Sequence, residues 1–74
     1  GIVIIYAIND NKVGLAVGVT KKLEDLFDAV KIVKAGSEII GGKGGGGRND
    51  FAQAGGTMPE KIEDSFECIK KLIN

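Results

Sequence analysis

The segment VGLAVGVT, residues 13–20, alternates large and small side chains without interruption. Its large residues are Val13, Leu15, Val17 and Val19, and its small ones are Gly14, Ala16 and Gly18. Because successive side chains of a strand point to opposite faces, the large set predicts a core face. The small set predicts a face that another element approaches closely.

The residues before this segment extend it into a hairpin. IVIIYAI, residues 2–8, is a continuous apolar run rich in β-branched residues, which is typical of a strand covered on both faces. NDNK, residues 9–12, is a cluster of turn formers. Residues 2–20 therefore predict a β-hairpin in which Tyr6 has a structural role.

After Thr20 the apolar spacing changes to that of a helix. Either Thr20 or Asp28 can cap this helix, and we favour Asp28, with residues 21–27 as a connector or short turn. The expected buried stripe consists of Ile32, Val33, Gly36, Ile39 and Ile40. Gly41 is expected to end the helix, because glycine is common just past a helix C-terminus.

The last third of the chain predicts a second helix. In TMPE, residues 57–60, Thr57 and Glu60 have the spacing of a capping box, and Pro59 falls in the first turn. The expected apolar face of this helix is Ile62, Phe66, Ile69 and Ile73, with Cys68 partly buried at its flank. Residues 50–56 predict a short edge strand. The order β-β-α-(β)-α gives an α+β domain with two helices packed on one face of a small sheet, as a single domain over residues 1–74.

Composition excludes several classes of function. The 74 residues carry ten basic and ten acidic side chains, so attraction of the whole surface to nucleic acid or membrane is not expected. One cysteine and no histidine exclude an internal disulfide and the usual structural zinc sites, which fits a reducing compartment. The longest apolar run, residues 2–8, is too short to cross a membrane, and no signal peptide is expected.

The glycine-rich segment GGKGGGGRNDFAQAGG, residues 41–56, has four interpretations. A dinucleotide fingerprint would need a strand before it and a helix after it, whereas a helix precedes it here. A Walker A loop would need Ser or Thr after Lys43, where the chain has Gly44. Two interpretations stay open. One is a flexible loop; the other is a backbone cradle for an anion, to which Lys43 and Arg48 would add charge.

The longer stretch IIGGKGGGGRNDFAQAGG, residues 39–56, closely resembles the signature near the C-terminus of alanyl-tRNA synthetases, in the domain shared with DHH-family phosphodiesterases. The order of elements around it is also similar. Synthetases mostly carry proline where this chain has Asn49, and the related phosphodiesterases carry histidine where it has Arg48. The resemblance therefore points to the synthetase branch and away from a nuclease.

The resemblance implies a C-terminal domain of a larger, cytoplasmic alanine–tRNA ligase, which contacts the outer corner of alanine-specific tRNA. Aminoacylation and editing would belong to upstream domains, for which it implies ATP, magnesium and zinc; this chain itself is expected to hold no catalytic residue, metal or cofactor. The isolated domain is expected to be monomeric, and the full-length enzyme dimeric in some members.

The expected tRNA- or phosphate-binding residues are Lys43, Gly44, Gly45, Gly46, Gly47, Arg48, Asn49 and Gln53. Phe51 could stack on a base, but we expect it in the core, because the chain has few aromatic residues. Lys12, Lys21 and Lys22 would extend the patch or simply be solvated. The alternative functions are a regulatory module that binds a nucleotide or phosphate in a closed pocket, and a purely structural interaction domain.

Overall fold

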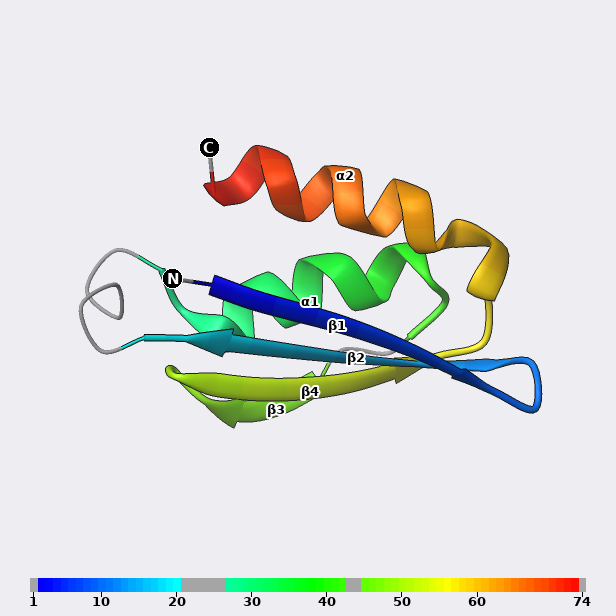
Figure 1. The fold of residues 1–74 in the computed structure, drawn as a ribbon, viewed down its shortest axis with the longest axis horizontal. Helices are drawn as coiled ribbons and strands as arrows, with labels where there is room; N and C mark the ends of the chain where they lie inside the picture. Colours follow the sequence, from blue (N-terminus) through cyan, green and yellow to red (C-terminus); the bar gives the residue numbers. More distant parts are fainter. Residues whose placement is uncertain (1, 21–26, 43–44, 74) are drawn as a thin grey trace.

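The fold is one antiparallel sheet with two helices on one of its faces (Figure 1). The computed structural model describes residues 2–20, 27–42 and 45–73. Its strands, in the spatial order β1-β2-β4-β3, are β1 (Ile2–Asn9), β2 (Lys12–Val19), β4 (Phe51–Gly56) and β3 (Gly45–Arg48). Its α-helices are α1 (Ala29–Ile39) and α2 (Ile62–Ile73). The predicted α+β class is confirmed. The glycine run adds a strand where a loop was expected.

The N-terminal hairpin is formed as predicted, but β1 is covered on one face only. Asp10 and Asn11 take positive φ angles of 52° and 63°, which suits a tight two-residue turn. The predicted core set of β2 is 0–5% exposed. Val3 and Ile5 of β1 are each 57% exposed, so the prediction that both faces of this strand are covered was wrong. β1 is an edge strand, and its apolar run belongs partly to an uncovered sheet face.

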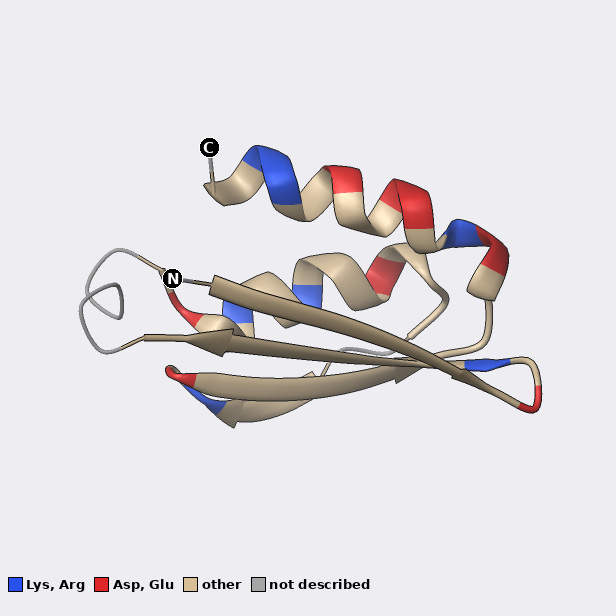
Figure 2. Cartoon of the chain, in the orientation of Figure 1, with Lys and Arg blue, Asp and Glu red and all other residues tan. Residues whose placement is uncertain are grey.

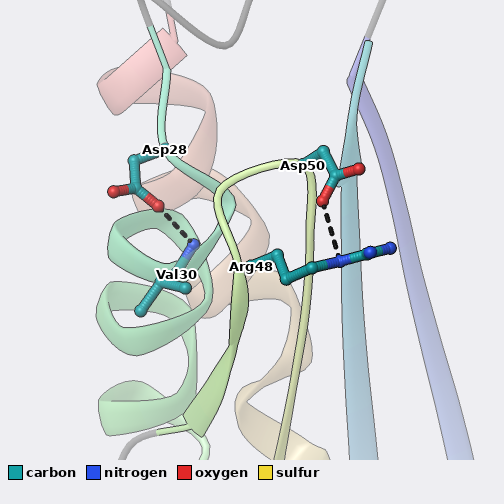
Figure 3. A network of polar contacts seen from close by, with 4 residues as sticks. All are labelled: Asp28, Val30, Arg48 and Asp50. Atoms are coloured by element: carbon teal, nitrogen blue, oxygen red, sulfur yellow. Dashed lines mark hydrogen bonds and ion pairs between the residues drawn. The ribbon is translucent and has the colours of Figure 1, made fainter. Parts of the chain in front are cut away.

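The first helix begins where the sequence predicted. The Asp28 side chain accepts a hydrogen bond of 2.9 Å from the Val30 N–H, so Asp28 is the N-cap (Figure 3). The helix ends before Gly41, whose φ of +83° is one that residues with a Cβ rarely adopt. Of the connector proposed between the hairpin and this helix, residues 21–26 lie outside the described residues.

The second helix begins differently from the prediction. Met58, without a side-chain cap, precedes a 3₁₀ turn at Pro59–Lys61 that leads into α2. The capping box at Thr57 was therefore wrong, and the Thr57 N–H instead donates to the Ile40 carbonyl at 2.9 Å. Pro59 does occupy the first position of the turn, as expected.

The apolar face of α2 is confirmed at its centre and ends. Ile69 is buried in the core, and Ile62 and Ile73 pack partly against it. Phe66, predicted on the same face, is instead 41% exposed, with Lys70 Nζ 5.9 Å from the centre of its ring. Cys68 is half-buried, as expected. No helix among residues 2–20, 27–42 and 45–73 is long and apolar enough to span a membrane.

A chain of hydrogen bonds joins the sheet to both helices. Ser65 of α2 donates its hydroxyl proton to the Gly36 carbonyl of α1 at 2.8 Å. Since that proton is used, the Tyr6 hydroxyl must be the donor in its 2.7 Å contact with Ser65 Oγ. Burial raises the pKa of the Tyr6 phenol above its ordinary value of 10.0, because it disfavours the charged phenolate. Tyr6 is therefore structural, as predicted.

The raised pKa of Tyr6 predicts a loss of stability in alkaline solution. Above the unfolded-state pKa of about 10 the unfolded chain releases the phenol proton while the folded chain retains it. This contribution to the free energy of unfolding is intact below that pH and falls as the pH rises. We expect the free energy of unfolding, measured by urea titration, to fall more steeply between neutral pH and about pH 11 in the parent than in Tyr6→Phe. Tyr6 is the only tyrosine, so phenolate absorbance reports its titration directly, and equal slopes would contradict the prediction.

Candidate nucleic-acid interface

The glycine run is part of the sheet. Strand β3 pairs with β4 in antiparallel register from Gly45 opposite Ala54 to Arg48 opposite Phe51. Successive N–H groups of an extended strand point in opposite directions, so residues 45–48 do not form the converging cradle proposed from the sequence. Of the predicted strand at residues 50–56, Phe51–Gly56 forms β4, but β4 lies between β2 and β3, so the prediction of an edge position was wrong.

Two of these glycines are required by the pairing of β3 with β4. A Cβ at Gly45 would collide with the Gln53 carbonyl oxygen and lie 2.6 Å from the Ala54 Cβ. A Cβ at Gly47 would collide with the Phe51 carbonyl oxygen, and the residue has a φ of +151°. Both positions belong to the alternating set that faces the helices. Strand β3 is also in contact with α1.

A second group of glycines closes the junction between α1 and β4. A Cβ at Gly42 would collide with the Gly55 carbonyl oxygen, and one at Gly56 would overlap the Ile40 carbonyl oxygen. That carbonyl accepts hydrogen bonds from the backbone N–H groups of Thr57 and Met58, at 2.9 and 2.8 Å. The chain leaving α1 thus lies directly against the end of β4, backbone to backbone.

Among the described residues, no helix lies on the opposite side of the sheet (Figure 1). We call this side the outer sheet face. By the strand registers its residues are Val3, Ile5, Ala7 and Asn9 of β1, Lys12, Gly14, Ala16 and Gly18 of β2, Phe51, Gln53 and Gly55 of β4, and Gly46 and Arg48 of β3. No acidic residue belongs to this set. In the four strands together only Lys12 and Arg48 are charged, and both are basic (Figure 2).

Arg48 is the exposed cation at one end of this face. Its side chain is 80% exposed, and its Nε lies 3.3 Å from Asp50 Oδ1 (Figure 3). This contact is an ion pair rather than an aligned hydrogen bond, because Asp50 Oδ1 has no hydrogen-bond partner among the described residues. An ion pair this exposed contributes little stability. Two guanidinium nitrogens lie outside the pair, so Arg48 can still bind a phosphate.

The turn that presents Arg48 is held by backbone hydrogen bonds on two sides. The Asn49 carbonyl accepts from the Ala29 N–H at 3.0 Å, and the Asp50 carbonyl accepts from the Val19 N–H at 2.8 Å. These bonds fix the turn to the start of α1 and to the end of β2. The side chain of Asn49 remains exposed beside Arg48.

Two outward residues of β4 complete this end of the sheet. Gln53 is exposed and lies in register between Ala16 and Gly46. Phe51 is 43% exposed on the same face, so the expectation that it fills the core was wrong. Ala52 takes the core position instead, as the alternation of "AQA" after Phe51 would have indicated.

The remaining predicted residues fall into two groups. Lys43, Gly44, Lys21 and Lys22 lie outside the described residues. Lys12 lies at the other end of the sheet, in an open hollow of about 390 Å³ that is also lined by Gly41, Gly42, Gly55 and Thr57. Gly18 lies in the same cross-strand row as Phe51 and Arg48. Lys12 is six residues from Gly18, which corresponds to roughly 20 Å along β2. Lys12 and Arg48 therefore mark opposite ends of an open surface. In residues 2–20, 27–42 and 45–73 no group of His, Cys, Asp and Glu side chains could hold a metal ion.

Comparison with known proteins agrees with the resemblance. A family model described as the DHHA1 domain matches residues 1–74. The chain is 46% identical over 73 residues to the alanine–tRNA ligase of Hyphomonas neptunium and 47% identical over 74 residues to that of Parvibaculum lavamentivorans. Each match covers 99% of this chain and 8% of the relative, so the chain spans a small part of these enzymes.

A solved structure supports the same assignment of fold. The C-Ala domain from Aquifex aeolicus alanyl-tRNA synthetase superposes with a TM-score of 0.91 at 31% sequence identity. The match covers 96% of this chain and 63% of that chain. Together with the family model and the named relatives, it confirms the resemblance found in the sequence.

The alternation of glycines in β3 predicts opposite effects for two adjacent substitutions. Gly45→Ala should lower the free energy of unfolding by about 1–3 kcal/mol, because its Cβ meets the backbone of β4. Gly46→Ala should leave it unchanged or raise it by up to about 1 kcal/mol, because no atom lies within 4 Å of the added Cβ. Urea unfolding of both variants beside the parent measures the difference. Equal losses at the two positions would show that this strand pairing is wrong.

Proposed function

This chain belongs to the DHHA1 domain family, and from that premise we propose that it is the C-terminal tRNA-binding domain of an alanyl-tRNA synthetase. The observation that carries the proposal is Arg48, which stands exposed at the end of a glycine strand, on a sheet face without acidic residues. Its proposed ligand is a backbone phosphate at the outer corner of alanine-specific tRNA. Asn49 and Gln53 lie close enough along the same hairpin to hydrogen-bond the adjoining sugar or base.

The charge of the domain favours weak binding of tRNA by the domain alone, and this binding would become effective when the domain is linked to the rest of a synthetase. With a formal net charge of zero, attraction to RNA must come from a few local cations. Lys43 remains a proposed second phosphate contact, and Gly46, which faces outward and carries no side chain, would let RNA approach the backbone of β3. In a longer enzyme, the effective concentration of a linked domain strengthens such a contact without any added interaction.

The remaining features of the proposed enzyme are those that the family resemblance implies. Attachment of alanine to tRNA, with its need for ATP and magnesium, and editing with zinc would belong to other domains of a cytoplasmic protein. This chain would bind the tRNA and contribute no reacting group. Alone it is proposed to be monomeric, and dimer contacts in the complete enzyme would lie elsewhere.

A salt titration of tRNA binding tests the proposal. Arg48→Ala should weaken binding to alanine-specific tRNA and flatten the plot of log K against log salt by about 0.7–0.9, the slope of one phosphate contact. Lys71→Ala is the matched control, because it removes one exposed positive charge from α2, on the other side of the sheet. Lys43→Ala tests the second predicted contact in the same way.

Three results bear on the assignment. A flatter slope for Arg48→Ala with an unchanged slope for Lys71→Ala supports the proposal. Equal effects of the two substitutions would show that tRNA binding is nonspecific charge attraction and would contradict a specific contact at Arg48. A parent domain that binds a blunt RNA duplex as tightly as folded tRNA would argue against recognition of the tRNA corner.

A further inference from the structure

The outer sheet face contains glycines that the fold does not require. A Cβ added at Gly14 or Gly46 would meet no atom within 4 Å. At Gly18 it would make only ordinary contacts with Phe51 and Val3, at 3.9 and 4.0 Å. Gly55 is similar, with the Val13 carbonyl oxygen at 3.7 Å, and none of the four has a φ in the left-handed region. Since glycine in a strand lowers stability relative to alanine, the contacts among the described residues do not account for this bare backbone.

The registers turn these positions into a shallow trough along β2. Gly18 lies between Val3 and Phe51, and Ala16 lies between Ile5 and Gln53. The flanking strands are two sheet spacings apart, roughly 10 Å, and their larger side chains form the walls. A hollow of about 180 Å³ lies over the trough beside Ile5 and Gln53. A flat group can reach this floor, which is built largely of peptide planes.

The chemistry of the walls fits a nucleobase. Phe51 is the one aromatic side chain of the outer sheet face, and it lies directly opposite Arg48 in the register of β3 and β4. An exposed ring offers stacking, the guanidinium offers a phosphate contact, and the Gln53 amide can both donate to and accept from a base edge. The absence of acidic residues from the face favours a polyanion. A second copy placed on the same face would instead bring like charges together.

We propose that the outer sheet face is a stacking platform for exposed nucleobases of the RNA, with Phe51 as its aromatic contact and the glycine backbone of β2 as its floor. This inference rests on the proposed function and deepens it. It assigns base recognition to the sheet face, separately from the phosphate contact of Arg48. RNA with unstacked or terminal bases would bind there, whereas the continuous stack of a duplex offers no base to the platform.

Two variants test the platform without disturbing the core. Phe51→Ala removes the ring, and Gly18→Val fills the floor at a position where the added Cβ would make only ordinary contacts. Phe66→Ala is the matched control, because Phe66 is 41% exposed against 43% for Phe51 but lies on α2. Binding to alanine-specific tRNA and to a closed-ended RNA duplex is measured over a range of salt. Urea unfolding verifies that each variant is folded.

We expect Phe51→Ala to weaken tRNA binding by about 5- to 150-fold, which corresponds to the 1–3 kcal/mol of one stacked base. Its salt slope should remain that of the parent, because no phosphate contact is lost. Gly18→Val should weaken tRNA binding as well, and neither variant should change duplex binding. Phe66→Ala should bind as the parent does.

The possible failures are separable. If Phe51→Ala and Gly18→Val bind tRNA like the parent while Arg48→Ala flattens the salt slope, the platform is overturned and the proposed function stands. If Phe66→Ala weakens binding as much as Phe51→Ala, the effect does not belong to the outer sheet face, and the platform is again overturned. If the parent shows no preference for folded tRNA, the proposed function and the platform fail together.

Discussion

The fold depends on the direct backbone contact between the end of α1 and the end of β4. Gly42 meets the Gly55 carbonyl there, and the Ile40 carbonyl accepts two backbone N–H groups from residues 57 and 58. With no side chain between the two segments, the chain can leave α1, form β3, and return through β4 into the centre of the sheet. A side chain at this junction would separate the helix layer from the strands that it covers.

The glycine-rich segment therefore has three structural roles that its composition does not distinguish. Gly41, Gly42 and Gly56 close the helix–strand junction, Gly45 and Gly47 face the helices, and Gly46 and Gly55 face outward. Only the two outward positions are free of internal constraint. The sequence interpretation gave Gly41 the role of a helix end and residues 50–56 that of a strand, but it treated the glycines between them as one loop and so missed this division. Side-chain periodicity is invisible in a run of residues that have no side chains.

Most of the framework could be predicted because its signals were local. The alternation in residues 13–20 identified the core face of β2, and Asp28 was identified as a cap from its place before an apolar helical period. The errors arose where the position of an element in the fold decides whether its side chains are buried or exposed. A β-branched run looks the same in a covered strand and in β1, an edge strand with one open face. Phe51 was expected inside for its residue type, although its register with Gly18 places it outside.

The backbone bonds of the Asn49–Asp50 turn have a consequence for the cost of recognition. Its carbonyls are held by the first residue of α1 and the last residue of β2, so the turn is ordered as soon as those elements dock. The loss of backbone entropy at this turn then occurs when the domain folds. A ligand then has to immobilise only the long, exposed side chain of Arg48, because the backbone of the turn is already ordered.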